Sequence, residues 1–262
     1  MPKQIKVNTS RTMPIAEYLQ YMASQGEYQL TDIKHPDLNK RPLPKTRRLS
    51  RYITYPEFLQ LLNGSLKFTS VNKLREHDYK EFLLQKQQID ENAPEFKTLT
   101  ADELEATRRL LEEKNWAKHW FVSCWTTETI ENMAFWKIFG SGGTGILIES
   151  TAAQITESLA DPPDYRFYKK RVRYSSDDIR ANVNAALFTK SMEFRYESEA
   201  RICFQVQYHY EDDYIFQRIY PEKLINRITL GPGIPWAYSD ATNLVQKFGL
   251  DPDIVRKSSY GK

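Results

Sequence analysis

The sequence predicts an α+β fold with a mixed, mainly antiparallel sheet that frames a cleft. Strand-like and helix-like segments follow one another without a strict βαβ repeat, which argues against a doubly wound α/β fold. The 262 residues are 40% hydrophobic and 13% aromatic, a composition typical of a folded chain with a sizeable core. The ten glycines are too few for a glycine-rich dinucleotide-binding design spread over the chain.

Six segments are expected to form strands because apolar and polar residues alternate in them or because they are rich in β-branched and aromatic residues. These are Arg51–Thr54, Ser65–Thr69, Trp120–Thr126, Gly145–Glu149, Arg171–Tyr174 and about Glu199–Tyr210. In the last of them, Ile202 and Phe204 should share one face, whereas Glu199 and Arg201 should lie on the other. A further apolar segment, 224–230, leads to a turn at Gly231.

Helices are expected where apolar residues recur at helical spacing between start and stop residues. Pro56 at a first helical position and Gly64 after the last turn bracket one short helix. The others are expected from Ile130 to Phe139, through Ile179, Val183 and Leu187, and from about Tyr238 to a stop at Gly249.

Charge and proline placement divide the chain into regions. Residues 1–50 carry nine Lys and Arg against four Asp and Glu and contain several prolines, so we expect a peripheral N-terminal arm there. Residues 51–262 are expected to form one α+β domain. Within it, the acidic stretch at about 76–118 predicts a helical insertion, in which Thr100 and Glu103 form a capping box.

Several classes of protein are excluded or disfavoured. No apolar run approaches the roughly 20 residues that a membrane span needs, and residues 1–6 lack the apolar stretch of a secretory signal. We therefore expect a cytoplasmic protein with no membrane partner. Cys124 and Cys203 lie far apart in strand-like contexts, which favours reduced thiols. The four histidines stand singly, so no metal site is predicted.

The glycine cluster Gly140–Gly145 resembles a phosphate-binding loop in composition only. A phosphate loop follows a strand and opens a helix, so that the backbone N–H groups of the helix start meet the phosphate. Here the cluster follows a predicted helix and opens a predicted strand. We interpret it as a helix end and a tight turn.

Glu197 and Glu199 are the first candidates for chemistry. They lie two residues apart at a strand start, next to Arg201, so their carboxylates should point to the same side. Like charges this close either raise the pKa of one carboxyl or attract a cation, and both responses are common at functional sites. The alternative is an ordinary ion-pair ladder in which Arg201 and a neighbouring cation neutralise both acids.

Ser123 and Arg51 are the second group of candidates. Ser123 should share a strand face with Trp125, opposite Cys124, where its hydroxyl either orients a ligand or bonds to the backbone. Arg51, beside Tyr52 at a strand start, could clamp a phosphate or pyrophosphate through two N–H groups. No histidine has a context that marks it as the base of a catalytic triad.

The order of these motifs resembles a widespread microbial family, domain of unknown function 2971. The resemblance covers about residues 51–235, and its most specific parts are the segment 136–148 and the Tyr-Glu-x-Glu-x-Arg signature at 196–201. It is carried by Arg51-Tyr52, Leu66–Thr69, Val122–Thr126, Phe135-Trp136, Gly145–Ile148, Val172–Tyr174, Lys190 and Tyr196–Arg201. The segment 75–78 departs from the Asn-Asp-Pro-type turn expected there. The family name implies no activity.

More distantly, the order Arg, strand Ser and Glu-x-Glu is similar to that of ADP-ribosyltransferases of the Arg-Ser-Glu type. This resemblance implies that NAD is a substrate and that a macromolecule is modified, an activity that would fit a toxin or phage-defence role. Arg51 would grip the pyrophosphate of NAD, Ser123 would support the nicotinamide-side strand, Glu199 would hold the ribose, and Glu197 would orient the acceptor.

Tyr52 and Arg201 would belong to the same cofactor-binding group. If the resemblance holds, the side chains of Arg51, Ser123 and Glu199 should line one concave pocket. If Arg51 and Glu199 lie on opposite sides of the molecule, the enzymatic interpretation fails.

Two other functions are compatible with the sequence. Residues 165–201 carry nine Lys and Arg against five acids, with Tyr165, Phe167 and Tyr168 nearby, which would suit a non-enzymatic module that binds nucleic acid or protein. The composition favours the alternative, in which the stripe is a solvated face of strands and a helix, because the net charge of +3 is small for a dedicated nucleic-acid binder. A metal-dependent nuclease built on Glu197, Glu199 and Lys190 is the third hypothesis, and it needs one more acid.

Overall fold

The structure is a computed structural model that describes residues 41–77, 81–82, 117, 119–160, 167–176, 183–206 and 212–261. Most of the expected helical insertion and residues 1–40 of the expected arm lie outside this part of the chain. The end of the expected arm belongs to the folded body. Leu43 is only 6% exposed and lies in the main core, and the first strand begins at Arg48 rather than at Arg51.

Nine strands of the described residues form one sheet, ordered β11-β10-β4-β1-β3-β2-β9, and β8 joins β3 to β5. Its pairs are antiparallel except for β10 with β11, so the predicted α+β fold with a mixed, mainly antiparallel sheet is confirmed. The strands are β1 (Arg48–Ile53), β2 (Ser65–Ser70), β3 (Trp120–Thr126), β4 (Ile146–Thr151), β5 (Tyr168–Arg171), β8 (Glu199–Gln205), β9 (Tyr214–Arg218), β10 (Arg227–Leu230) and β11 (Val255–Lys257).

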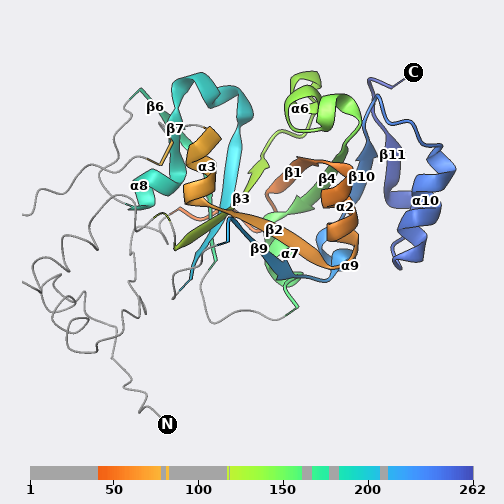
Figure 1. Cartoon of the computed structure of the whole chain (residues 1–262), viewed down its shortest axis with the longest axis horizontal. Helices are drawn as coiled ribbons and strands as arrows, with labels where there is room; N and C mark the ends of the chain where they lie inside the picture. The colour runs from red at the N-terminus through yellow and green to blue at the C-terminus, as the bar shows by residue number, and fades with distance from the viewer. Residues whose placement is uncertain are drawn as a thin grey trace, which may run out of the picture.

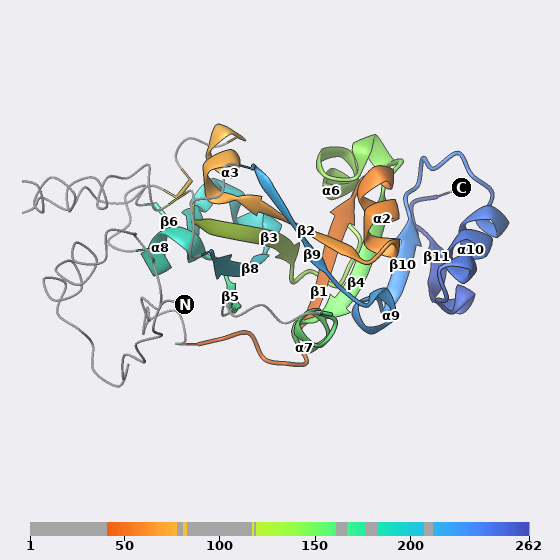
Figure 2. The ribbon, with the colours of Figure 1, turned by 60° about the horizontal axis from the view of Figure 1, so that its bottom comes forward.

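The sheet forks at β3. Along one edge, β3 pairs with β8 over its whole length. Along the other edge, Phe121 and Val122 pair with β2, whereas Thr126 pairs with Ser50 of β1. Figure 2 shows the result: β1, β4 and β10 run across the direction of β2 and β3. Between the two pairings, the edge of β3 near Ser123 has no paired strand among the described residues.

The two faces of this sheet carry different side chains. The inner face, defined by Leu49, Phe121, Trp125 and Ile202, belongs to the main hydrophobic core. Helices α2 (Tyr55–Leu62), α7 (Ala152–Glu157), α9 (Pro221–Leu224) and α10 (Tyr238–Lys247) contribute to that core (Figure 1).

The outer face is defined by Tyr52, Val122, Cys124 and Cys203. Helix α6 (Met133–Ile138) covers its β1 and β4 part, and α3 (Val71–His77) and α8 (Val183–Phe188) cover its β3 and β8 part. The predicted alternation in β8 is confirmed, because Ile202 and Phe204 lie in the inner core whereas Cys203 lies in the outer one.

Local signals explain the element ends. The Thr54 hydroxyl accepts from the N–H of Glu57, whose carboxylate accepts from the N–H of Thr54, which fixes the start of α2. Gly64, at φ 81°, follows its end, as predicted. Helix α6 begins at Met133 rather than Ile130, because Asn132 caps it by accepting from the N–H of Ala134.

The segment Arg171–Tyr174, expected as one strand, is divided between two ladders. Val172 N–H still donates to Glu199 O, but β6 (Arg173–Ser175) then pairs in parallel with β7 (Thr189–Ser191). The chain changes partner at Val172, whose side chain is buried. Local alternation is the same in both strands and therefore could not reveal the change.

The glycine cluster is a turn, as predicted. The N–H groups of Gly143 and Gly145 both donate to Gly140 O after the end of α6. A Cβ at Gly145 would lie 2.5 Å from Ile53 O, so the close approach of β1 requires glycine there. None of the helices in the described ranges is long and apolar enough to cross a membrane.

Candidate functional site

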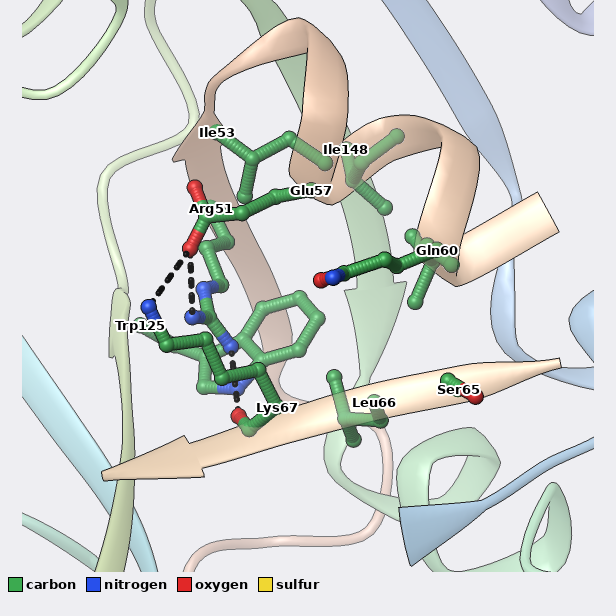
Figure 3. A pocket seen from close by; sticks show the side chains of 10 residues that line it. Arg51, Ile53, Glu57, Gln60, Ser65, Leu66, Lys67, Trp125 and Ile148 are labelled. Carbon is green, nitrogen blue, oxygen red and sulfur yellow. Dashed lines mark hydrogen bonds and ion pairs between the residues drawn. The ribbon is translucent and has the colours of Figure 1, made fainter. Parts of the chain in front are cut away.

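Arg51 lies on the inner face, at the fork of the sheet. Its Nη1 donates to Ser123 Oγ at 2.7 Å and to Lys67 O at 3.3 Å, and its Nη2 lies 3.9 Å from the Glu57 carboxylate. Figure 3 shows the guanidinium between β2 and α2, with Lys67 also reaching Glu57. Arg51 therefore joins β1, β2 and β3 at the fork. We call Arg51, Glu57, Lys67, Ser123 and Trp125 the fork junction.

The fork junction leaves little room for a ligand. Ser123 is 1% exposed, and its Oγ accepts from both Arg51 and Trp125 Nε1, the latter at 3.0 Å. The cavity lined by Arg51, Trp125 and their neighbours measures about 20 Å³, roughly the space of one water molecule. Ligand pockets usually measure hundreds of Å³. In this arrangement Arg51 is bonded to acceptors of the protein itself.

Tyr52, one residue along, points to the outer face. Its ring lies 5.5 Å from that of Phe135 and 4.8 Å from that of Trp136, and its hydroxyl accepts from the N–H of Asn132 at 2.9 Å. Burial raises the pKa of Tyr52 to about 12. Tyr52 thus holds α6 and its cap against the sheet.

A second group of charges lies on the outer face of β8. Lys190 of β7 places its Nζ 2.8 Å from Glu197, 3.6 Å from Glu199 and 3.7 Å from Glu81. Arg201 donates to both carboxylate oxygens of Glu199, at 2.8 and 3.0 Å, and also pairs with Glu81. We call these five residues the charge cluster.

A backbone carbonyl, two aromatic rings and a tyrosine hydroxyl also contact the charge cluster. Arg201 is 1% exposed, donates to Leu187 O at 2.7 Å and stacks on the Phe82 ring. Lys190 lies over the Phe194 ring at 4.6 Å, and Tyr174 OH accepts from the N–H of Glu199 at 2.7 Å. Burial raises the pKa of Tyr174 to about 12, so its hydroxyl stays protonated.

Glu197 and Glu199 have opposite pKa shifts. Burial alone would raise the pKa of Glu199, but Arg201 and Lys190 lower it to about 2. Burial raises the pKa of Glu197 above its ordinary value, and the contact with Lys190 offsets this rise only in part. Burial would lower the pKa of Lys190, but Glu199 and Glu81 raise it, so the ammonium stays charged. Cys124 and Cys203 are free thiols whose pKa burial raises.

Glu81 is the functional candidate that the sequence did not reveal. It supplies the further acid that the nuclease hypothesis required, and it reaches Arg201 across 120 residues of sequence. Lys190 and Arg201, however, lie between the three carboxylates. Within the described ranges, no group of three or more His, Cys, Asp or Glu has the geometry to hold a metal ion. No local pattern distinguishes Glu81 from the other acids of its segment.

The structure divides the six predicted site residues between two faces. In the β3–β8 ladder Ser123 pairs with Ile202 and Thr126 pairs with Glu199, so Ser123 and Glu199 point to opposite sides of the sheet. Arg51 and Ser123 meet at the fork junction, and Glu197, Glu199 and Arg201 meet in the charge cluster. The expectation that Arg51, Ser123 and Glu199 line one concave pocket is therefore wrong, and the enzymatic interpretation that places these three residues in one site fails with it.

The basic stripe at 165–201 is also divided. Lys190 and Arg201 belong to the charge cluster, and Lys170 is 8% exposed and donates to Asn184 at 2.8 Å. Arg171, Arg173 and Arg195 are exposed. Lys169 is partly exposed and donates to Thr156 Oγ1. The last two stripe cations, Arg166 and Arg180, lie outside the described residues, as does Tyr165.

The aromatic residues expected beside the stripe pack inward. Phe167 contacts the rings of Phe68 and Phe204, and Tyr168 is 9% exposed and lies in the outer core. Neither ring is presented beside the exposed arginines as a platform for stacking bases.

Comparisons with family models, with curated proteins and with solved structures gave no match for this chain. The resemblance to domain of unknown function 2971 and the more distant one to ADP-ribosyltransferases therefore stay predictions from the sequence.

Proposed function

We propose that the protein is an enzyme similar to ADP-ribosyltransferases, which cleaves the glycosidic bond of NAD and transfers ADP-ribose to a macromolecule. In this proposal the charge cluster, and not the fork junction, is the catalytic site. The observation that carries it is the pair of carboxylates Glu197 and Glu199, which share the Lys190 ammonium and have opposite pKa shifts.

Two carboxyl groups whose pKa values are pushed apart are suited to two different roles. Glu199 stays ionised, so its negative charge can stabilise the oxocarbenium-like ribose that forms as nicotinamide leaves. Glu197 binds a proton more readily than an ordinary glutamate, so it suits the removal of a proton from the attacking acceptor hydroxyl or amine. Lys190 and Glu197 retain 12% and 11% side-chain exposure, whereas Arg201 retains 1%.

The roles of the other predicted residues follow from their contacts. Arg201 orients Glu199 through two hydrogen bonds and is a positioning residue in this proposal. Arg51, Tyr52 and Ser123 have structural roles, because their polar groups contact β2, α6 and Trp125. The proposal therefore keeps NAD as the substrate but moves its binding to the outer face.

The test measures both binding and turnover of NAD. A ligand that binds only the native state raises its apparent stability, so thermal unfolding with millimolar NAD reports binding without a known acceptor. Release of nicotinamide reports cleavage, because water can serve as the acceptor. We expect wild type to show both. Glu197→Gln should lower nicotinamide release about 100- to 10,000-fold, the usual contribution of general acid–base catalysis.

Arg51→Met is the matched control from the fork junction. It should lower the melting temperature of the free protein but keep the increase that NAD causes. If Arg51→Met abolishes that increase and Glu197→Gln leaves turnover intact, the catalytic site is not the charge cluster. The proposed activity is wrong if millimolar NAD does not raise the melting temperature of wild type and wild type does not cleave NAD. The binding-module hypothesis then becomes the one to test.

A further inference from the structure

The backbone between Glu197 and Glu199 has a conformation that an ordinary strand lacks. Ser198 has φ 44° and ψ 45°, in the left-handed region that residues other than glycine rarely adopt. It follows η3 (Met192–Glu197) and precedes the first residue of β8. The turn makes the two carboxylates converge on one ammonium from different elements. Strain of this kind persists only where surrounding contacts hold it.

Those contacts come from the end of β3. Thr126 Oγ1 donates to Glu197 O at 2.7 Å and accepts from the N–H of Glu128 at 3.1 Å. Thr127 donates twice to Ser198 O, from its N–H at 2.9 Å and from its Oγ1 at 3.0 Å. Both carbonyls of the turn are therefore fixed by two successive threonines, and Thr126 is only 7% exposed.

We propose that Thr126 is a positioning residue for Glu197, assisted by Thr127, and that the two hold the left-handed turn which brings Glu197 and Glu199 to the Lys190 ammonium. That Thr126 contributes to catalysis rests on the proposed function. That Thr126 holds Glu197 in place can be measured without NAD. A valine at either position keeps the side-chain shape and removes the hydroxyl. A serine at Thr126 keeps the hydroxyl and removes a methyl group.

The experiment follows the titration of Glu197 in the full chain by NMR of isotope-labelled glutamate carboxyl carbons. Glu197→Gln assigns the signal. The groups that face Glu197 are Lys190, Glu199, Glu81 and Tyr174, with Arg201 behind Glu199. We expect Thr126→Val to move the titration midpoint of Glu197 down toward that of an ordinary glutamate, because a released turn exposes the carboxyl. Thr126→Ser should restore the wild-type midpoint.

Thr229→Val is the matched control. Thr229 is a buried strand residue of β10 whose hydroxyl accepts from Arg256 at 2.7 Å, away from the charge cluster. It should lower stability without moving the midpoint of Glu197. If Thr126→Val unfolds, the partly exposed Thr127 offers a second variant, Thr127→Val, with the same expected direction. A midpoint that stays at the wild-type value in Thr126→Val, or in Thr127→Val in its place, overturns the inference.

The effect of Thr126 on the rate of catalysis is measured separately. Where wild type releases nicotinamide, Thr126→Val should lower the rate about tenfold or more, and Thr126→Ser should recover most of it. If wild type neither binds nor cleaves NAD but the midpoint moves as expected, the proposed function fails and the positioning of Glu197 stands. If NAD is cleaved but the titration midpoint of Glu197 does not move, the proposed function stands and the positioning of Glu197 by Thr126 fails.

Discussion

The fork junction and the charge cluster lie on opposite faces of one sheet and use charged residues in different ways. At the fork junction, Arg51 donates to neutral oxygens of Ser123 and Lys67, and Glu57 pairs with both Arg51 and Lys67, so one positive charge is left over. In the charge cluster, three carboxylates surround two cations, so one negative charge is left over. The extra charge of the fork junction is shared with the partly exposed Lys67, whereas the charge cluster is more deeply buried, and burial raises the pKa of Glu197.

This difference shows why buried charge alone does not mark a functional site. Arg51 donates hydrogen bonds where the sheet forks, and this role is structural. Glu197 sits where burial and neighbouring carboxylates oppose its ionisation, which lowers stability at neutral pH. Groups that a fold keeps in an unfavourable ionisation state are better candidates for chemistry than groups whose interactions are all favourable.

The largest effect should come from the centre of the charge cluster. Arg201→Met removes the buried cation that pairs with Glu199 and Glu81, so it leaves unbalanced carboxylates in the outer core. We expect a loss of about 3–5 kcal/mol in the free energy of unfolding, measured by urea denaturation. A loss below about 1 kcal/mol would mean that Arg201 is not the cation on which the cluster depends.

The next largest effect should be the pH dependence of stability, because Glu199 and Glu197 of the charge cluster have opposite pKa shifts. The folded pKa of Glu199 lies near 2, below its ordinary value of 4.5, so its stabilising contribution is complete above pH 4.5 and lost as the pH falls toward 2. The loss should reach up to about 3 kcal/mol.

Glu197 contributes in the opposite sense. Its folded pKa is raised, so its contribution is complete below pH 4.5 and lost as the pH rises through the folded value. Denaturation of wild type and Glu199→Gln between pH 2 and 6 checks both, and an unchanged pH profile in Glu199→Gln would contradict the assignment.

Arg51→Met should have an intermediate effect. Ser123 Oγ still accepts from Trp125, and Glu57 still pairs with Lys67, so most partners keep an interaction. We expect a loss of about 1–3 kcal/mol, with no change in the titration of Glu197. A change in that titration would show that the two faces are coupled through the sheet.

Lys67→Met should have the smallest effect. The pair of Lys67 with Glu57 has a distance of 3.4 Å and is about one quarter exposed at each side chain. Such a pair contributes less than about 1 kcal/mol, and salt screens it. Urea denaturation of wild type and Lys67→Met at low and high salt measures the contribution of this pair to the free energy of unfolding. A loss as large as that of Arg51→Met would mean that Lys67, rather than Arg51, holds the fork.

Much of the fold could be predicted from local sequence. Alternation identified the strands at Ser65 and Glu199, and runs of aromatic and β-branched residues identified those at Arg51, Trp120 and Gly145, which have buried apolar side chains on both faces. Pro56 and Gly64 predicted the helix between them, and the order of helix and strand around Gly140–Gly145 identified a turn. Where β5 ends and β6 begins could not be predicted, because a change of pairing partner leaves the alternation unchanged.

Some contacts of the candidate site could be predicted from the sequence, and others could not. The contact of Glu199 with Arg201 follows from their spacing in one strand. Glu197 lies before the strand and approaches Glu199 only through the turn at Ser198, and Glu81 reaches Arg201 across 120 residues of sequence. The left-handed Ser198 had no signal either, because serine is not a residue that marks this conformation.

The sequence by itself determined which residues of each strand share a face: Ser123 with Trp125, and Glu199 with Arg201. Only the tertiary structure decided how those faces combine. Thr126 pairs with Glu199, and because side chains alternate with a period of two, a shift of one residue in this register would place Ser123 and Glu199 on the same side. Burial of Ile202 and Phe204 in the inner core fixes the register, and with it the separation of Arg51 from Glu199.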